Sequence, residues 1–470
     1  MKLPISFIES TRALMGDEEY QELSVALEQV PPASVWLNSK FPGLAACSSI
    51  SGRIPWAAEG YYLNQRLTFT FDPLFHAGCY YVQEASSMFV EQVLRRYVTT
   101  PVKMLDLCAA PGGKSTHARS VLPEGSLLVA NEVIRNRSQI LAENLTKWGY
   151  ADVVVTNNDP SDFSRIGSFF DVILTDVPCS GEGMFRKDPG AIEEWSPENV
   201  EICCQRRIIT DIWPCLKPGG ILIYSTCTYN TREDEENITW IRQEFGAEPL
   251  PLAVPTEWNI TGSLLFGVDA PVYRFLPHKT QGEGFFLAAL RKPEEDREAD
   301  TDLFSPKKKK SKGDTAASPV SKENLAIAKS WLASSDEYNL LVNGTAITAF
   351  PVYYQNDLAL LRQSLRIVQA GTEVAEVKGK DLIPAHGLAM SRLLKTSVFS
   401  TEALTYEQAI AYLRKEAIVL PPSVPKGYVL VTYKEIPLGF VKNIGNRANN
   451  LYPQEWRIRS GYLPDDIRTL

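Results

Sequence analysis

The sequence contains no run of apolar residues that approaches the roughly 18 needed to cross a membrane as a helix. Its beginning, "MKLPISFIESTRALMGDEEY", has a single lysine and only a brief apolar stretch before acidic residues, so it does not resemble a secretory signal. The composition, with 44% hydrophobic and 22% charged residues, is typical of a globular protein. We therefore expect a cytoplasmic protein without a membrane segment.

The sequence also lacks the Cys-x-x-Cys spacing of zinc sites and small disulfide frameworks, so its cysteines are expected to be free thiols without a metal. Three of them, Cys203, Cys204 and Cys215, fall in "SPENVEICCQRRIITDIWPCLKPGG", where apolar residues recur every four positions. This pattern predicts one helix, capped by Ser196 and stopped by the Pro-Gly-Gly at 218–220. The three cysteines are expected to be packing or near-surface residues.

A surplus of basic residues, which usually accompanies binding to nucleic-acid phosphates, is absent too, since the formal net charge is −8. The sum conceals a local difference, because residues 401–470 contain nine lysines and arginines against seven aspartates and glutamates. The stretch "RANNLYPQEWRIRS" in this segment brings Arg447, Arg457 and Arg459 near aromatic residues. The C-terminal part can therefore carry a basic patch that contacts RNA.

Composition and periodicity divide the chain into segments. Residues 293–322 are charged, contain proline and serine, and include the run "KKKK", which is typical of a solvated linker. Residues 1–95 have no clear period and predict a small accessory domain, whereas residues 96–292 alternate apolar strands with helical stretches. Residues 323–400 are expected to form an intermediate domain and residues 401–470 a small β domain with a hairpin around "KEIP".

The alternation in residues 96–292 predicts a mostly parallel sheet covered by helices. We expect strands in "VKMLDLC", "LLVANE", "DVVVT", "DVILTDV" and "GILIYSTC", followed by a hairpin through "YRFLP" and "GEGFFLAAL". Sites in such sheets lie at the carboxyl ends of the strands. Cys179, in "DVPCSGEG", and Cys227, in "STCTY", both fall at such ends.

A glycine turn follows the first predicted strand, where "MLDLC" runs into "AAPGGKS". The Pro-Gly-Gly permits a sharp bend and presents amide N–H groups at a helix N-terminus, where an anionic group can bind. Many such turns are only tight connections. Glu132, however, ends the next strand about 20 residues on, where an acidic residue commonly accepts hydrogen bonds from ribose hydroxyls. Together the two features predict an adenosine-containing cofactor.

The glycine turn matches neither the dinucleotide fingerprint G-x-G-x-x-G nor the Walker pattern, which argues against NAD and ATP. Asp106 offers a carboxylate to an amino group, which fits a zwitterionic methionine moiety better than a pyrophosphate. We therefore predict S-adenosylmethionine as the cofactor. Asp159, at the end of "VVVTNND", is either a contact on the adenine side or a turn former before Pro160.

Cys179 and Cys227 have two interpretations. Each can be a small buried apolar residue, the usual fate of a lone cysteine. Their position beside the predicted cofactor site favours catalysis, because carbon 5 of cytosine takes a methyl group only after a thiolate adds at carbon 6. A second thiol can assist the later steps.

Four stretches, "LDLCAAPGGKS", "DVPCSGEGMFRKDP", "LKPGGILIYSTCTYN" and "YVQEASSM", resemble the Nop/Sun family of RNA cytosine-C5 methyltransferases. The order of the whole chain is similar to that of a bacterial member that acts on 16S rRNA, and the match is strong from Tyr80 to Lys292. The resemblance implies an α/β fold with a Rossmann-like methyltransferase core that uses S-adenosylmethionine. It also implies a small RRM-like N-terminal extension and a PUA-like C-terminal domain.

The resemblance implies roles for individual residues. Cys227 is expected to be the nucleophile, Cys179 to assist resolution and product release, and Asp176 to contact cytosine or the cofactor amine. The implied cofactor contacts are Cys108, Ala109, Ala110, Pro111, Gly112, Gly113, Lys114, Glu132, Asp159 and Asp176, with Cys108 as a wall of the pocket.

One element departs from the family pattern. Members often carry Arg-x-Asn near the N-terminus, whereas this chain has Trp36, Leu37 and Asn38. The RNA contact of that arginine therefore cannot be transferred. Trp36 is either a base-stacking residue or part of the core.

We expect methylation of cytosine C5 in ribosomal RNA by a monomer, with 16S rRNA or the small ribosomal subunit as the partner. The target base must leave its stack, so the flanking domains are expected to hold the surrounding RNA. The same reaction on tRNA is an alternative, which the domains after Lys292 disfavour by resemblance. A non-catalytic ribosome-assembly factor is disfavoured by the two cysteines and Asp176, and methylation of an exocyclic amine by the absence of Pro-Pro-Tyr.

Overall fold

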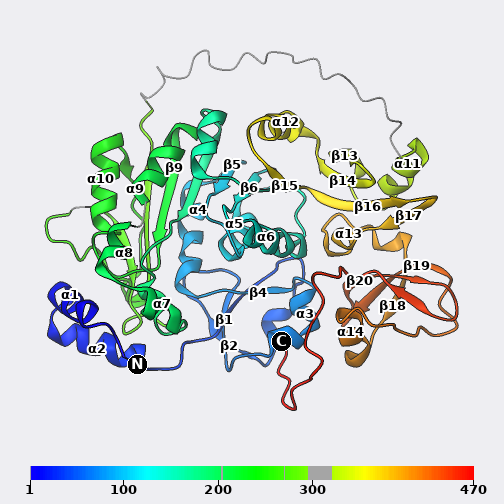
Figure 1. Cartoon of the computed structure of the whole chain (residues 1–470), viewed down its shortest axis with the longest axis horizontal. Helices are drawn as coiled ribbons and strands as arrows, with labels where there is room; N and C mark the ends of the chain where they lie inside the picture. Colours follow the sequence, from blue (N-terminus) through cyan, green and yellow to red (C-terminus); the bar gives the residue numbers. More distant parts are fainter. Residues whose placement is uncertain (1, 203–204, 269, 295–319) are drawn as a thin grey trace.

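The computed structural model of the chain describes residues 2–202, 205–268, 270–294 and 320–470 (Figure 1). Cys203, Cys204 and most of the predicted linker, including the lysine run, lie outside these ranges. Within them, no helix is long and apolar enough to cross a membrane. The same residues contain no cluster of histidine, cysteine, aspartate and glutamate that could hold a metal ion.

A nine-stranded sheet forms the centre of the molecule, in the order β10, β12, β9, β8, β5, β6, β7, β15, with β11 paired to β12. The strands from β9 to β7 are parallel, which confirms the predicted parallel sheet. β11 and β12 form the predicted antiparallel hairpin. The bounds are β5 (Lys103–Asp106), β6 (Leu127–Asn131), β7 (Val153–Thr156), β8 (Phe170–Asp176), β9 (Leu216–Thr226), β10 (Glu248–Pro249), β11 (Val272–Phe275), β12 (Phe285–Arg291) and β15 (Ile367–Ala370).

Helices cover both faces of this sheet because successive strand residues point to opposite sides. Met104 packs with α4 (Val90–Tyr97), α5 (Gly113–Val121) and α6 (Arg135–Trp148) in one core. Leu105, the next residue, packs in a second core with α9 (Gln205–Ile212), α10 (Glu235–Phe245) and α12 (Gln355–Ser364). This doubly wound arrangement is the Rossmann-like core that was expected.

The single helix predicted between Ser196 and residues 218–220 is wrong in its second half. The structure has α8 (Pro197–Ile202), then α9, and then the short 3₁₀ turn η6 (Trp213–Cys215). Leu216 already belongs to β9 and pairs with Phe170 of β8. Pro214 lacks the N–H that a helix interior needs, and β9 begins two residues after it. Cys215 is fully buried, which confirms its packing role.

The N-terminal unit begins with two helices, α1 (Ile5–Met15) and α2 (Asp17–Leu27), which lie beside α7 (Pro189–Glu194) in Figure 1. A four-stranded antiparallel sheet follows, in the order β2 (Ile50–Arg53), β3 (Gly60–Leu63), β1 (Ser34–Leu37), β4 (Tyr80–Val82), as expected for an RRM-like unit. Trp36 on β1 is 1% exposed, and its ring lies 3.7 Å from that of His117 on α5. Trp36 is therefore a core residue and not a base-stacking one.

Two further four-stranded sheets follow residue 320. The first contains β13 (Tyr338–Asn343), β14 (Ala346–Pro351), β16 (Thr372–Lys378) and β17 (Asp381–Pro384), flanked by α11 (Lys322–Ser330) and α13 (His386–Met390). The second contains β18 (Ser400–Ala403), β19 (Gly427–Tyr433), β20 (Ile436–Asn443) and β21 (Ala448–Asn450), with α14 (Tyr406–Leu413). The hairpin predicted around "KEIP" is confirmed, since β19 and β20 pair across Lys434 and Glu435.

The C-terminal segments are joined to the rest of the chain in two places. β15 pairs antiparallel with β7, so a strand that follows the linker extends the central sheet. The last sheet and the N-terminal unit share one hydrophobic core, which includes Val35, Tyr412 and Leu470. The N–H of Leu470 donates to Asp72 at 2.8 Å, and Figure 1 shows the C-terminus beside α3 (Pro73–His76). The N-terminal sheet and α3 are therefore joined to the last sheet by one core.

Candidate active site

The predicted cofactor loop lies between the end of β5 and the start of α5. Gly112 precedes α5 with φ +115°, a conformation that favours glycine, and thereby turns the chain into the helix. A side chain at Gly113 would come within 3.2 Å of the Tyr81 ring, so the backbone of the loop is closely covered on that side. The glycine loop therefore leads into a helix N-terminus, as the sequence predicted, and binding of an anionic group by its first N–H groups stays a prediction.

Asp106, at the end of β5, carries an incompletely satisfied buried carboxyl group. Its side chain is fully buried, and one oxygen accepts a hydrogen bond from Ser115 at 2.6 Å. The other oxygen, Oδ1, is buried without a hydrogen-bond partner among the described residues. Burial raises the pKa of Asp106 from 3.8 to about 7. An ammonium group of a ligand would satisfy the free oxygen and favour the ionised form.

Glu132 lies just beyond the end of β6 and is 3% exposed. Its Oε1 accepts a hydrogen bond from the N–H of Ile134 at 2.8 Å, and its Oε2 lies 3.4 Å from Nη1 of Arg137. These contacts fix the carboxylate at the carboxyl edge of the sheet, beside the glycine loop. The position suits the predicted contact with ribose hydroxyls, which remains a prediction.

Asp159 has the turn-forming role that the sequence left open. Its side chain caps the 3₁₀ helix η4 (Pro160–Ile166) by accepting hydrogen bonds from the N–H and the hydroxyl of Ser161 at 3.0 and 2.6 Å. These hydrogen bonds lower the pKa of Asp159, so the carboxylate is ionised at neutral pH. Its second proposed role, on the adenine side of the cofactor, stays a prediction.

The two cysteines meet at the ends of neighbouring strands. β8 ends at Asp176 and β9 at Thr226, and the strands run in parallel with Asp176 opposite Ser225. This pairing brings Sγ of Cys179 to 3.3 Å from Sγ of Cys227, and the N–H of Cys227 lies 3.4 Å from Sγ of Cys179. Both cysteines are partly exposed free thiols, so neither is the fully buried apolar residue of the alternative interpretation.

The thiol of Cys179 keeps its proton at neutral pH. The hydrogen bond with Cys227 raises the pKa of Cys179 well above its usual value, and burial raises it further. Cys108 is partly buried in the cofactor loop. Burial raises the pKa of its thiol far above the usual range, so this thiol too keeps its proton. Cys108 therefore suits a pocket wall and not a nucleophile, as expected.

Lys114 connects the cofactor loop to the cysteines. Its Nζ donates to Oδ2 of Asp176 at 2.8 Å, while the hydroxyl of Ser225 donates to Oδ1 of the same carboxylate at 2.9 Å. Burial lowers the pKa of Lys114, but Asp176 and then Cys227 outweigh this effect and raise it. Lys114 is thus a permanent cation, and its ion pair with Asp176 joins α5 to the end of β8, a contact that the sequence did not indicate.

Two buried carboxylates near the cysteines were missed by sequence reasoning. Glu182 and Glu233 are 2% and 1% exposed and lie on the segments that follow Cys179 and Cys227. No signal in one sequence separates them from the many surface glutamates.

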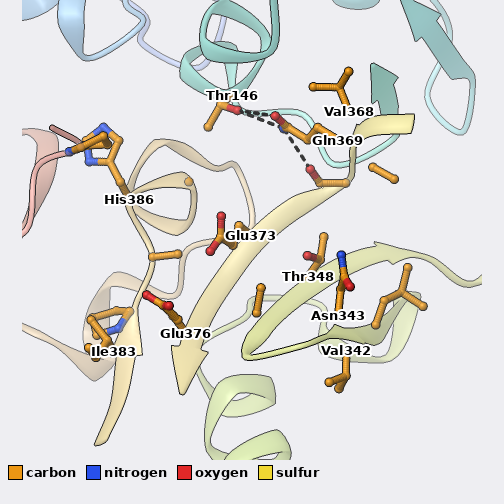
Figure 2. A pocket seen from close by; sticks show the side chains of 18 of the residues that line it. Thr146, Val342, Asn343, Thr348, Val368, Gln369, Glu373, Glu376, Ile383 and His386 are labelled. Carbon is orange, nitrogen blue, oxygen red and sulfur yellow. Dashed lines mark hydrogen bonds between the residues drawn. The ribbon is translucent and has the colours of Figure 1, made fainter. Parts of the chain in front are cut away.

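A separate cavity of about 920 Å³ lies among the C-terminal units, and its walls come from β14, β16, α13, Thr146 of α6 and Trp456. Figure 2 shows Glu373 and Glu376 of β16 directed into it. The residues that line it include none of the predicted site residues. Its charged lining residues balance, with Glu373, Glu376 and Glu455 against Arg362, Lys378 and Lys415, so charge indicates no particular ligand.

Three family models match the chain. One, described as 16S rRNA methyltransferase RsmB/F, matches residues 99–291. The second, described as the N-terminal domain of 16S rRNA methyltransferase RsmF, matches residues 3–85. The third, described as the methyltransferase RsmF PUA domain, matches residues 400–458.

Curated relatives are similar over most of their length. The ribosomal RNA small subunit methyltransferase F of Shigella boydii serotype 4 (strain Sb227) is 31% identical over 433 residues, which cover 87% of this chain and 85% of that protein. The protein of the same name from Escherichia coli O81 (strain ED1a) is 31% identical with the same coverage.

Solved structures from Pyrococcus horikoshii are also similar. A methyltransferase homolog protein is 28% identical with a TM-score of 0.52, and the match covers 61% of this chain and 94% of that one. The structure of NSun6 with SFG is 22% identical with a TM-score of 0.52, covers 62% and 98%, and supports the fold alone.

Proposed function

The chain belongs to the 16S rRNA methyltransferase RsmB/F family, and from this premise we propose that it methylates carbon 5 of a cytosine in 16S rRNA through a covalent adduct with Cys227. The methyl donor is S-adenosylmethionine. The contact of 3.3 Å between the sulfur atoms of Cys179 and Cys227, at the carboxyl edge of a Rossmann-like sheet, is the observation that carries the proposal.

The two thiols have different surroundings, which supports different roles. Cys227 receives a hydrogen bond when the Cys179 thiol acts as donor, and we propose that Cys227 reacts as the thiolate. The Cys227 thiolate attacks carbon 6 of cytosine and makes carbon 5 nucleophilic. Cys179, whose raised pKa keeps it protonated, assists release of the methylated base from Cys227.

The residues around the glycine loop fit S-adenosylmethionine, which supplies the methyl group when bound. The unpartnered Oδ1 of Asp106 is available to the ammonium group, and the N-terminus of α5 to the carboxylate of the methionine moiety. Glu132 is proposed to accept hydrogen bonds from the ribose, and Asp159 to lie on the adenine side. Cys108 to Lys114 form the wall of this site.

Asp176 is proposed to contact the cytosine or the amine of the cofactor, and Lys114 to belong to the cofactor site. Their ion pair joins α5, which begins at the glycine loop, to the end of β8, three residues before Cys179. Asp176 holds one hydrogen bond from Ser225 in addition, which orients its carboxylate toward the site. A cytosine amino group can donate to this carboxylate.

The RNA must present an unstacked cytosine, since the sulfur atoms lie inside the edge of the sheet. The RRM-like and PUA-like units at the two ends of the chain support an RNA contact outside the core. The names of the curated relatives favour small-subunit rRNA over tRNA. A monomer remains the proposed state of the protein, and the cytoplasm is the proposed compartment for an rRNA substrate.

Transfer of a tritiated methyl group to 16S rRNA and to tRNA tests the proposal. The wild-type protein should label 16S rRNA at cytosine C5, as located by bisulfite sequencing, while Cys227→Ala should label neither RNA and still bind S-adenosylmethionine. Cys215→Ala is the matched control, because that thiol is buried in the core. Substantial labelling by Cys227→Ala would refute the nucleophile assignment, and labelling of tRNA alone would refute the substrate.

A further inference from the structure

We propose that Glu182 is a positioning residue, which holds the segment after Cys227 against the segment of Cys179 so that the two sulfur atoms stay in contact. The proposal rests on the proposed function, since the separate steps of the two cysteines are assigned there. Glu182 opens the 3₁₀ turn η5 (Glu182–Met184), three residues beyond Cys179. The hydrogen bonds of its carboxylate go to neighbours of Cys227 and to Trp195, and not to either sulfur atom.

The carboxylate of Glu182 accepts hydrogen bonds from three consecutive residues of the segment that follows Cys227. Its Oε2 accepts hydrogen bonds from the hydroxyl of Thr228 at 2.7 Å and from the N–H groups of Tyr229 and Asn230 at 2.8 and 3.1 Å. Its Oε1 accepts from the side chains of Asn230 at 3.2 Å and Trp195 at 3.0 Å. Five donors therefore converge on one buried side chain, and four of them belong to Thr228, Tyr229 and Asn230, the residues that directly follow Cys227.

Close backbone packing transmits this constraint to Cys227. The N–H of Gly183, next to Glu182, donates to the carbonyl of Cys227 at 2.8 Å. A side chain at Gly183 would lie 2.4 Å from the carbonyl oxygen of Gly284 and 3.0 Å from that of Cys227. The segment of Cys227 thus cannot shift toward Gly183, and Glu182 prevents it from shifting away.

Glu233 provides a reciprocal contact from the other segment. Its carboxylate accepts hydrogen bonds from the N–H of Ser180 at 3.0 Å and from the hydroxyl of Ser180 at 2.5 Å, directly after Cys179. Each cysteine is therefore followed by residues that bind a buried carboxylate on the opposite segment. Glu182 is the clearer test, because its donors on the Cys227 segment include two backbone N–H groups.

The outer side of Glu182 is covered by the N-terminal helices. Trp195, which donates to Glu182, packs its ring against that of Phe7 on α1 with 5.7 Å between centroids. Arg186 donates to the carbonyl of Ala26 on α2 at 3.2 Å. These contacts exclude water from the carboxylate, and burial raises the pKa of Glu182 while its hydrogen bonds with Thr228 and Tyr229 oppose the rise. Loss of the charge should therefore disturb the five donors strongly.

Glu182→Gln tests the proposal, because an amide nitrogen would face donors and displace the Cys227 segment. Asp72→Asn is the matched control. Asp72 is also fully buried and accepts hydrogen bonds from Leu74, Tyr80 and Leu470, but it lies in the core that joins the two ends of the chain. The first measurement is oxidation of the two cysteines by diamide, in which two thiols lose two hydrogens to form one disulfide and diamide becomes its hydrazine.

Peptide mapping should show that the disulfide between Cys179 and Cys227 forms about 10-fold more slowly in Glu182→Gln than in wild type. A displacement of about 1 Å slows a reaction in which the two sulfur atoms must be in contact. Asp72→Asn should oxidise at the wild-type rate. Both variants should bind S-adenosylmethionine as wild type does. Methyl transfer by Glu182→Gln should fall about 10-fold or more. RNA-linked protein should accumulate, because release requires Cys179 beside the adduct.

If Glu182→Gln does not fold, Thr228→Val removes one donor at nearly constant volume and should slow oxidation in the same direction. Oxidation at the wild-type rate in whichever of these variants is folded would overturn the positioning role, as would equal slowing in Asp72→Asn. The proposed function fails separately, through methyl transfer by Cys227→Ala, and that failure leaves the oxidation results unchanged.

Discussion

The affinity for S-adenosylmethionine should fall as the pH drops below 7, because Asp106 must be ionised to accept the ammonium group. Burial raises the pKa of Asp106 to about 7, so about half of the protein is ionised at this position at pH 7 and about 9% at pH 6. The dissociation constant should therefore rise about fivefold over that unit and about tenfold over each further unit. Because binding favours the ionised carboxylate, it should also release a proton in this range.

Isothermal titration from about pH 5.5 to about pH 7.5, in buffers of different ionisation enthalpy, measures both the dissociation constant and the proton release. The α-amino group of the ligand, with a pKa of about 7.7–8, is mostly protonated over this range. Asp106→Asn should bind weakly and lose the pH dependence. Asp159→Asn is the control, because the lowered pKa of Asp159 keeps it ionised throughout and the wild-type slope should persist. A wild-type dissociation constant that is flat over this range would refute the assignment of Asp106 to the ammonium group.

Three further predictions concern the proposed site. Cys179→Ala should form the adduct at Cys227 without resolving it, and should accumulate a denaturant-resistant, nuclease-sensitive band of reduced mobility; a band from Cys227→Ala instead would exchange the two roles. Glu132→Ala should weaken binding of S-adenosylmethionine by about 1–3 kcal/mol in a titration, the usual scale for lost charge-assisted hydrogen bonds, and an unchanged constant would leave Glu132 a structural residue. Gly183→Ala should abolish most methyl transfer in the tritium assay and keep cofactor affinity, because its Cβ would meet Gly284 at 2.4 Å, and wild-type activity would contradict the packing described for these segments.

The central sheet and the meeting point of the cysteines could be predicted from the sequence because both depend on local patterns. Apolar runs marked the strands, and parallel strands bring their carboxyl ends to one edge, so Cys179 and Cys227 were expected at that edge before any distance was known. The 3.3 Å contact between their sulfur atoms depends on the register of β8 against β9. A strand pattern does not specify register between parallel neighbours.

Other features depend on contacts between distant residues and have no local signal. The sequence predicted a helix through Leu216, because four-residue spacing was read across Pro214, yet pairing with Phe170 makes Leu216 part of a strand. β15 is four residues long, and it becomes a strand through pairing with β7. In the sequence Glu182 resembles any glutamate in a glycine-rich loop, because its five donors come from distant residues, four from the Cys227 segment and one from Trp195.

The core shared by the first and last units has a consequence for synthesis of the protein on the ribosome. Domains usually fold as they emerge, beginning at the N-terminus. Here Val35 and Leu37 of β1 are buried together with Tyr412, Tyr452 and Leu470. The sheet that contains β1 therefore cannot complete its core until the much later segment with these three residues has been made. Chains that stop before the last sheet should expose this apolar surface and be recognised by chaperones or proteases.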